Sequence, residues 1–374
     1  MSIADRARAG IGPLEAGDAE SWLAFQAEHH GPTSRQADPA WMSWQAANPS
    51  IDPGEPTVWV CRRDAGIVGS QGSVPFGLKE GGRMVAGAWA TDLMVAPAWR
   101  LRGVGPALTE RLIGGRRLVA GIGISDAAYR SFLRAGWRDL GEIPWYVRPR
   151  DVGWVVGEAG LTGMRRLAIR LGLGLTVAAT GIGWSVLGRA LGARLEPVAR
   201  FDERVDRVWA DAVRRHGVIA ARDSRALAWR FDAVPGASAH ERYYLVVKGR
   251  VRGYVVLRSG AWRGRRVVEV LDYLVAPRWL PVLFAGVARL PLARGASAIT
   301  VSTLSPVCDR ALRAVGFIPG MAGTRAGRIS FRTNLATRFM VCAGPDEDRP
   351  ALHRDRWFVT AADADSGWRP DPAA

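Results

Sequence analysis

The chain has 374 residues, of which 48 % are hydrophobic and 23 % are charged, as in an ordinary globular protein long enough for two domains. Its formal net charge of +16 comes almost entirely from arginine and favours anionic partners such as phosphorylated cofactors, anionic lipid surfaces or nucleic acid. The sequence has no compact basic block interleaved with aromatic residues and no zinc or helix-turn-helix signature, so we expect no nucleic-acid partner.

The first half of the chain predicts a helix, three strands, a helix, a strand, a helix and a closing strand. Asp18 is placed to cap the first helix, and Pro97 ends the longest strand. Gly136 follows the last helix, where a left-handed residue is needed to close it. In this order, the expected elements span residues 18–28, 57–62, 66–75, 84–95, 101–113, 118–122, 125–135 and 145–148.

A long uncharged segment follows, from residue 171 to residue 188. Its length is near the lower limit for a membrane-spanning helix, and its five glycines weaken its helix propensity. A spanning helix would place the two halves of the chain on opposite sides of a bilayer. We therefore expect a helical connector that is buried between domains or lies against a membrane surface through residues 165–194. Its basic flanks are Arg165, Arg166, Arg170, Arg189 and Arg194.

The second half predicts the same order of elements. A helix is expected over residues 201–215, then strands over 243–248, 253–258 and 266–275, a helix over 280–289, a strand over 298–302 and a helix over 306–315. The tail reads as a short strand over residues 356–360, and two acidic residues follow it, Asp363 and Asp365.

Three features recur in both halves at an offset of about 180 residues. The first is DLMVAP at 92–97, which recurs as DYLVAP at 272–277. The second is Gly136-Trp137, which recurs as Gly316-Phe317. The third is a tryptophan with a proline a few residues later, Trp44 with Pro49 and Trp229 with Pro235. This repetition predicts an α/β fold with an α+β mixed sheet in two tandem domains. The expected parts are a domain at 11–149, an apolar helical connector at 150–197, a second domain at 198–344 and a C-terminal tail at 345–374.

The cysteines Cys61, Cys308 and Cys342 lie far apart, in no metal-ligand spacing. We therefore expect reduced, buried thiols in a cytoplasmic protein, and no metal site. Residues 1–10 carry charges and no apolar stretch, so we expect no signal peptide.

A glycine loop lies between the third strand and the next helix of the first half, with the sequence Arg100-Leu101-Arg102-Gly103-Val104-Gly105. The glycines let a phosphate approach the backbone, and the amides at the helix N-terminus favour an anion there. Pro106 sits in the first helical turn, where its missing N–H costs little. The loop therefore suits a pyrophosphate group, and a tight turn between strand and helix is the simpler alternative.

This segment resembles the GNAT superfamily of N-acetyltransferases, whose signature is Arg/Gln-x-x-Gly-x-Gly/Ala after a strand that ends in a β-bulge. Arg100, Gly103 and Gly105 match it. The resemblance implies that the loop from Arg100 to Pro106, including Leu101, Arg102 and Val104, holds the pyrophosphate of acetyl-CoA or another acyl-CoA. It also implies that the backbone of Leu93, Met94 and Val95 pairs with the pantetheine arm.

The next block of the family falls on Ser125, Ala128, Phe132, Gly136 and Trp137. Ser125 is placed to hydrogen-bond the cofactor. Phe132 stands where the family often has the tyrosine that protonates the leaving thiolate, and a phenyl ring donates no proton. Tyr129, one helical turn earlier, is an alternative acid or an ordinary half-buried aromatic residue.

Two positions are candidates for the base that deprotonates the acceptor. Asp92 lies before the expected bulge, and it is either the base or an inward carboxylate paired with an arginine. Its counterpart Asp272 favours the structural role. His29 and His30 precede a region that lines the acceptor cleft in this fold, and exposed loop histidines are the alternative.

The second half has lost the glycine loop. The positions of Arg100, Gly103 and Gly105 carry Leu280, Leu283 and Ala285 there, so we expect a degenerate GNAT-like domain and one acyl-CoA site per chain.

The favoured function is an acyltransferase that moves an acetyl or similar acyl group to a small-molecule, peptide or sugar amine by direct attack in a ternary complex. A non-catalytic module that binds acyl-CoA or a peptide is one alternative. An aminoacyl transferase of cell-envelope biosynthesis is another.

Overall fold

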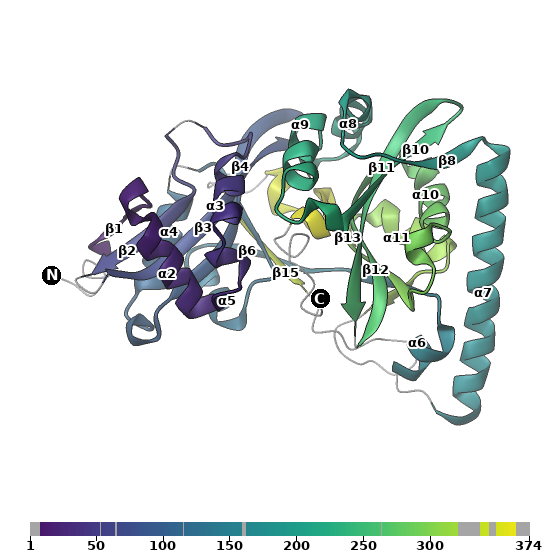
Figure 1. Ribbon diagram of the computed structural model, residues 1–374, viewed down its shortest axis with the longest axis horizontal. Coiled ribbons are helices and arrows are strands. Elements are labelled where there is room, and N and C mark those ends of the chain that lie inside the picture. Colours follow the sequence, from purple (N-terminus) through teal and green to yellow (C-terminus); the bar gives the residue numbers. More distant parts are fainter. Residues whose placement is uncertain are drawn as a thin grey trace.

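The computed structural model describes residues 8–52, 54–63, 66–114, 116–158, 162–262, 264–320, 337–343 and 349–363, so Asp365 of the expected tail lies outside them (Figure 1). Each strand and helix expected in the first half is present there. The helices and strands of this half are β1 (Ile11–Pro13), α2 (Ala19–His30), α3 (Pro39–Ala46), β2 (Val58–Arg63), β3 (Gly66–Glu80), β4 (Arg83–Val95), α4 (Val104–Ile113), β5 (Leu118–Ile122), α5 (Asp126–Arg134), β6 (Arg138–Ile143) and β7 (Trp145–Pro149).

The rest of the chain begins with two connecting helices, α6 (Val152–Glu158) and α7 (Gly163–Ala190). The elements of the second half are β8 (Ala193–Pro197), α8 (Asp206–Arg215), β9 (Val218–Ala220), α9 (Ser224–Leu227), β10 (His240–Val247), β11 (Arg250–Trp262), β12 (Arg265–Val275), α10 (Leu280–Val287), β13 (Ala298–Leu304), α11 (Pro306–Ala314), β14 (Ile318–Gly320), β15 (Thr337–Ala343) and β16 (Trp357–Thr360).

Some expected boundaries move for local reasons. The helix expected from residue 101 begins at Val104, because Leu101 and Gly103 have φ angles of 62° and 82° and continue the loop. The helix expected from residue 201 is preceded by a 3₁₀ turn over Glu203–Val205, so its α-helical part begins at Asp206.

A single mixed sheet joins the two halves in the strand order β6-β15-β5-β4-β3-β9-β16-β13-β12-β11-β10-β8. In each half, three antiparallel strands lead to a parallel partner: β2, β3, β4 and β5 in the first half, and β10, β11, β12 and β13 in the second. The halves meet where β9 pairs with β3 and β16 pairs with both β9 and β13.

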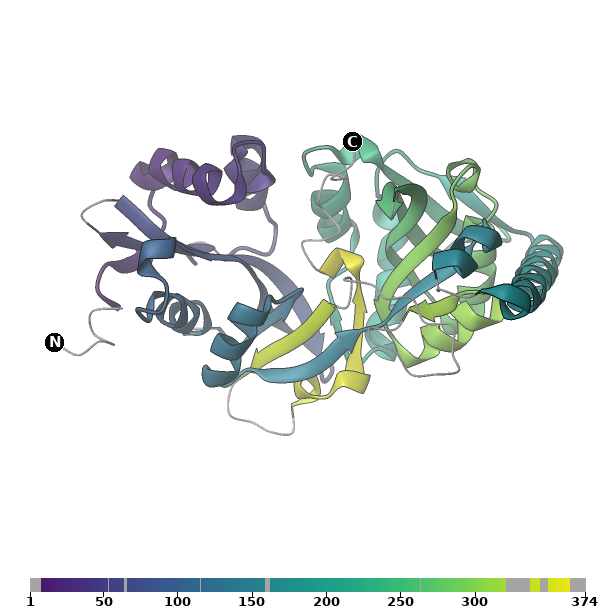
Figure 2. The ribbon, with the colours of Figure 1, turned by 90° about the horizontal axis from the view of Figure 1, so that it is seen from below.

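The two halves exchange their closing strands (Figure 2). The strand β7 of the first half lies between β13 and β14, and pairs antiparallel with both. The strand β15 of the second half lies between β5 and β6, and also pairs antiparallel with both. The part of the sheet in each half is therefore completed by a strand from the other half. The expected limits at residues 149 and 344 stay a prediction, and β7 and β15 pair across them.

The repeated tryptophans form the centre of the contact between the halves. The rings of Trp44 and Trp229 stack with centroids 4.4 Å apart and planes 3° from parallel. The indole N–H of Trp44 donates to the Trp229 carbonyl at 2.8 Å, and that of Trp229 donates to the Trp44 carbonyl at 2.9 Å. Both rings are buried, so equivalent positions of the two halves bind each other reciprocally.

We predict that the chain unfolds as one cooperative unit, because each half lacks a strand without the other. Urea unfolding followed by far-ultraviolet circular dichroism and by tryptophan fluorescence should give coincident transitions. A fragment of residues 8–158 should be insoluble alone, since β5 and β6 would expose free edges, and soluble when co-expressed with residues 162–363. Two separate transitions, or a soluble and folded fragment 8–158, would contradict the interdependence of the halves.

Candidate functional site

The strand β4 carries a bulge at Asp92 and Leu93. On the neighbouring strand β3, Gly72 lies opposite Thr91 and Ser70 lies opposite Met94, so the single residue between them faces two residues of β4. Asp92 adopts a left-handed φ of 49°, which aspartate tolerates better than most residues. The bulge therefore lies at the position that the family resemblance implied.

Beyond the bulge, β4 is free along the edge that faces β5. The parallel pairing of these strands is confined to Ala88 with Val119 and Trp89 with Ala120. The other edge of β4 remains paired with β3 as far as Val95. The two parallel strands thus separate, and leave backbone groups of the end of β4 available to an extended ligand.

The glycine loop presents free amides next to this gap. The first backbone hydrogen bond of α4 runs from the N–H of Ala107 to the Gly103 carbonyl at 3.1 Å, so the amides of Val104 and Gly105 precede the helical ladder. A Cβ placed on Gly105 would meet Val95 at 3.7 Å, which is ordinary contact. The loop has the geometry of an anion site at a helix N-terminus.

The charged side chains of the loop differ in their contacts. The Nε of Arg100 donates to the Val95 carbonyl at 3.0 Å, so this side chain ties the loop to the end of β4. The guanidinium of Arg102 lies 5.4 Å from the ring centre of Trp99. Leu101 is fully exposed. The cofactor contacts of these residues and of Pro106 stay a prediction.

In the second half, the chain itself fills the equivalent gap. Strands β12 and β13 pair in parallel from Val267 to Val270 and then separate, but β16 follows β13 there, with Thr360 opposite Thr303. The hydroxyl of Thr360 donates to Asp272 at 2.7 Å. Leu283 and Ala285, which stand 180 residues after Gly103 and Gly105, are buried. This half therefore has neither the free amides nor the open strand edge.

Asp272, the repeat counterpart of Asp92, belongs to a buried ionic network. Its carboxylate accepts from the Nε of Arg222 at 3.2 Å and from the Tyr254 hydroxyl at 2.7 Å. Arg222 also binds Asp363, and all four side chains are buried. Burial and the charge of Asp272 hold the pKa of Tyr254 well above its usual range. Asp272 is therefore a structural carboxylate.

Asp92 has a more open environment. Its carboxylate accepts from Gln36 Nε2 at 3.0 Å and lies 3.9 Å from the nearest guanidinium nitrogen of Arg35. The side chain is 18 % exposed and borders a small cavity between α2 and β4. The alternative of an inward carboxylate beside an arginine is thus realised, and the role of Asp92 as a base stays a prediction.

His30 lies at the end of α2, within the electrostatic reach of Asp92. Burial lowers the pKa of His30 from its usual 6.5, Asp92 opposes this shift, and Arg35 and His29 reinforce it. Its Nε2 is buried and has no hydrogen-bond partner among the described residues. His29 instead packs edge-on against Phe25, with centroids 4.5 Å apart. Of the two histidines, His30 is the one whose Nε2 is buried without a hydrogen-bond partner among the described residues.

The helix α5 holds the other expected residues. The Ser125 hydroxyl caps this helix by accepting from the Ala128 amide at 3.3 Å. The Tyr129 hydroxyl donates to Asp139 at 2.8 Å, which raises the pKa of this phenol. Phe132 is buried and stacks on Trp137 at 4.3 Å. The roles of Ser125 and Tyr129 in catalysis and cofactor binding stay predictions, and the hydroxyl of Tyr129 is already engaged.

The three cysteines are free and buried, as expected, and burial raises the pKa of Cys308 to about 12. Within the described ranges, no group of three or more His, Cys, Asp or Glu side chains is arranged to hold a metal ion. The expected absence of a metal site stays a prediction.

The two repeat-related aspartates give a matched pair of stability measurements. Asp272→Asn should lower the free energy of unfolding by about 3–5 kcal/mol, because it leaves Arg222 buried with one fewer charge partner. Asp92→Asn should lower it by about 1 kcal/mol or less, since its ion pair is long and partly exposed. Equal effects in urea titrations of the two variants would argue against the difference in roles.

The comparisons with known proteins identify the fold. No protein-family model matches the sequence, and no curated protein is significantly similar to it. Among solved structures, a GCN5-related N-acetyltransferase from Anabaena variabilis is 13 % identical, with a TM-score of 0.55 over 89 % of this chain and 72 % of that chain. One from Kribbella flavida is 15 % identical, with a TM-score of 0.54 over 88 % and 71 %.

A Saccharomyces cerevisiae N-myristoyltransferase with bound myristoyl-CoA is 11 % identical, with a TM-score of 0.51 over 90 % of this chain and 79 % of that chain. These likenesses extend across both halves of the chain. The protein therefore has the fold of the GCN5-related N-acetyltransferases and N-acyltransferases.

Proposed function

We propose that the protein transfers an acyl group from acyl-CoA, with acetyl-CoA as the first candidate, to an amine. One observation carries this proposal: a bulge, a free strand edge and unbonded amides follow one another along β4 and the start of α4. They follow one another in the order in which a thioester, a pantetheine arm and a pyrophosphate are joined in an acyl-CoA, which supports the proposal. The bound myristoyl-CoA of one structural neighbour supports an acyl-CoA as the co-substrate.

In this proposal, the backbone of Leu93, Met94 and Val95 pairs with the amide groups of pantetheine along the free edge of β4. The amides from Leu101 to Gly105 hold the pyrophosphate, and Arg102 adds positive charge. Ser125 caps the start of α5, and in this proposal its hydroxyl donates to the cofactor. The second half supplies no cofactor contact, because β16 fills its gap.

The chemical step is direct attack of the amine nitrogen on the thioester carbonyl. A nitrogen–carbon bond forms, the carbon–sulfur bond breaks, and the amine proton passes to a base. His30 and Asp92 are the candidates for that base, and the unpartnered Nε2 of His30, whose pKa burial lowers, favours the histidine. The thiolate leaves without a strong acid, since Phe132 has no proton and Tyr129 shares its proton with Asp139.

A non-catalytic module that binds acyl-CoA is the second candidate. The stacked Phe132 and the engaged hydroxyl of Tyr129 favour it, because they leave the usual position of the acid empty. Consumption of acetyl-CoA with pooled amines, amino sugars and peptides separates the two. An enzyme releases free thiol in an acceptor-dependent way, and a binding module does not.

The loop assignment is tested by Gly103→Glu. The carboxylate would repel a pyrophosphate and occupy its place, so the affinity for acetyl-CoA should fall by about 100-fold or more in calorimetric titration. Gly236→Glu is the matched control, because Gly236 has a similar φ of 78°, open space around it and no place in the loop. Equal affinities of the two variants, or no binding by the wild type, would refute the assignment.

The base is tested by the pH dependence of kcat/KM. A neutral imidazole is required, so the rate should rise with pH and level off above the pKa of His30, which burial holds below 6.5. His30→Gln should lower kcat by about 10²–10⁴-fold and remove this limb of the profile. His29→Gln is the control. If His30→Gln is active and Asp92→Asn is not, Asp92 is the base.

A further inference from the structure

The helix α7 runs along the outer edge of the second half and is largely uncovered (Figure 1). Among the described residues it is the one helix long and apolar enough to cross a membrane, and 11 % of its apolar window is buried. It carries most of the large apolar side chains that are exposed in the described chain, including Met164, Leu167, Leu171, Leu175, Ile182 and Val186.

These side chains form one stripe along the helix. Their successive spacings of three, four, four, seven and four residues place them on a single face. The opposite face is held by the body of the protein. The indole of Trp184 donates to the Ala314 carbonyl at 3.1 Å, and Arg148 donates to the Val177 carbonyl at 3.1 Å. The stripe therefore points away from the fold.

The topology does not allow α7 to cross a bilayer. The strand before it, β7, pairs with β13, and the strand after it, β8, pairs with β10 of the same sheet. The helix α7 also packs against α10 and β8, so a spanning α7 would carry this folded α/β half into about 30 Å of hydrocarbon. An apolar stripe held in this way is placed to lie flat on a membrane surface.

Arginines surround the ends of the stripe. Arg165, Arg166 and Arg170 belong to its first turns, and Arg189 to its last. A cavity of about 220 Å³ lies between the end of α7 and α10. Its lining combines apolar and basic side chains, among them Trp184, Leu195, Val282, Arg189, Arg194 and Arg289. Apolar walls with arginines beside them suit a phosphate headgroup and the first part of an acyl chain.

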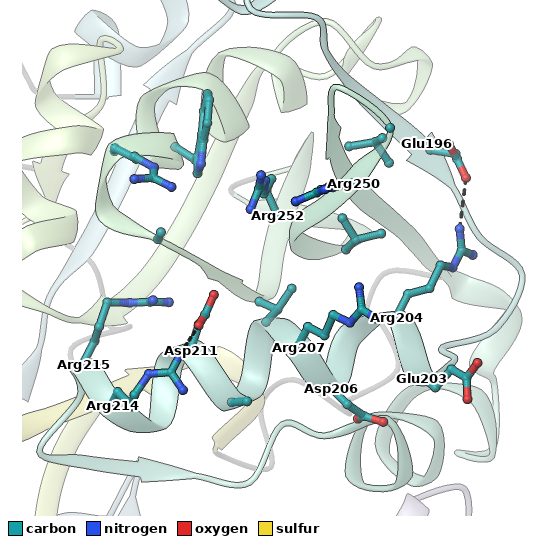
Figure 3. Close-up of a pocket in the computed structure, with 18 of the residues that line it drawn as sticks. Glu196, Glu203, Arg204, Asp206, Arg207, Asp211, Arg214, Arg215, Arg250 and Arg252 are labelled. Carbon is teal, nitrogen blue, oxygen red and sulfur yellow. Dashed lines mark hydrogen bonds and ion pairs between the residues drawn. The ribbon is translucent and has the colours of Figure 1, made fainter.

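The basic surface continues past this cavity, because Arg194 also lines a second cavity of about 970 Å³ (Figure 3). Eight arginines and four acidic residues line it. Figure 3 shows Arg207 and Arg215 on α8 and Arg250 and Arg252 on the other side of the hollow.

The acidic residues of this second cavity pair with three of its eight arginines, because Glu196 also lies 3.4 Å from Arg204 and Asp211 pairs with Arg214. Glu196 pairs with Arg194 at 3.1 Å, and Asp206 accepts from the Ser224 amide at 2.7 Å. Arg207, Arg250 and Arg252 have no carboxylate partner in the described part of the chain, and the Nε of Arg252 is buried without a hydrogen bond. Such a surface attracts anions.

We propose that α7 docks this protein on a bilayer that contains anionic phospholipids, together with the arginines that line the two cavities at its C-terminal end, such as Arg189, Arg194 and Arg289. The stripe enters the boundary between headgroups and acyl chains, and the arginines bind lipid phosphates. Neither element belongs to the proposed acyl-CoA site in the first half. Docking and acyl transfer therefore fail independently of each other.

Flotation with vesicles tests the stripe. The full chain should bind vesicles of phosphatidylcholine with 30 % phosphatidylglycerol and bind pure phosphatidylcholine weakly. The variant Leu171→Gln/Leu175→Gln/Ile182→Gln should bind the anionic vesicles at least about ten-fold more weakly, with unchanged circular dichroism and acetyl-CoA affinity. Met84→Gln/Leu133→Gln is the control, since both side chains are exposed and apolar and lie off α7. Equal binding by wild type and the α7 variant would overturn the proposal.

Two further measurements separate the lipid from other occupants. Arg189→Gln/Arg289→Gln should reduce binding to anionic vesicles and its dependence on salt. The fluorescence emission of a dye attached at Ile182→Cys should shift to the blue with anionic vesicles, and that of a dye attached at Met84→Cys should not.

Two results would assign these surfaces to other occupants. If the wild type does not bind vesicles but forms a dimer that the α7 variant loses, the stripe binds a second copy of the chain. Inorganic triphosphate that binds in the arginine cavity while vesicles do not would assign that cavity to a soluble anion. Either of these two results would overturn the proposal that the protein docks on a membrane.

Discussion

The exchange of closing strands is the constraint on which the rest of this structure depends. Strand β7 leaves the first half to pair with β13 and β14, and β15 returns from the second half to pair with β5 and β6. Every strand edge next to these two is satisfied only by the other half. The reciprocal hydrogen bonds of Trp44 and Trp229 lie where the halves meet, and hold equivalent positions against each other. The two halves therefore behave as one body, and the position of either one fixes the other.

The two halves differ in the gap between their parallel strands, which lies between β4 and β5 in the first half and between β12 and β13 in the second. In the first half the gap after Trp89 stays open, and the glycine loop lies at its end. In the second half β16 enters the gap, and Arg222 ties its end to Asp272 and Asp363. A buried arginine with two carboxylates requires a closed environment, whereas Asp92 next to an open edge does not. One physical difference, the presence of β16, thus accompanies both the absence of the glycines in the second half and the different environments of Asp92 and Asp272.

The sequence predicts local structure well here because its signals are local. Periodic apolar residues, Pro97 and Gly136 set the main strands and helices, and the glycines at 103 and 105 mark the loop. The exchange of β7 and β15 has no such signal, because an alternating strand does not specify its partner. The three-residue strand β9 is too short for a periodic pattern. Gln36, which binds Asp92, comes from a turn with no pattern at all, so only the fold brings these two side chains together.

The same rigidity fixes the orientation of α7 relative to the rest of the fold. A helix with an apolar face on a flexible linker would orient nothing, but α7 is fixed at both ends by strands of one sheet. That sheet continues without a break through β13, β16, β9 and β3 to β4 and the glycine loop. A surface bound by α7 would therefore set the orientation of the proposed acyl-CoA site relative to that surface. In this arrangement the second half, which has no glycine loop at the equivalent positions, positions the half that carries one.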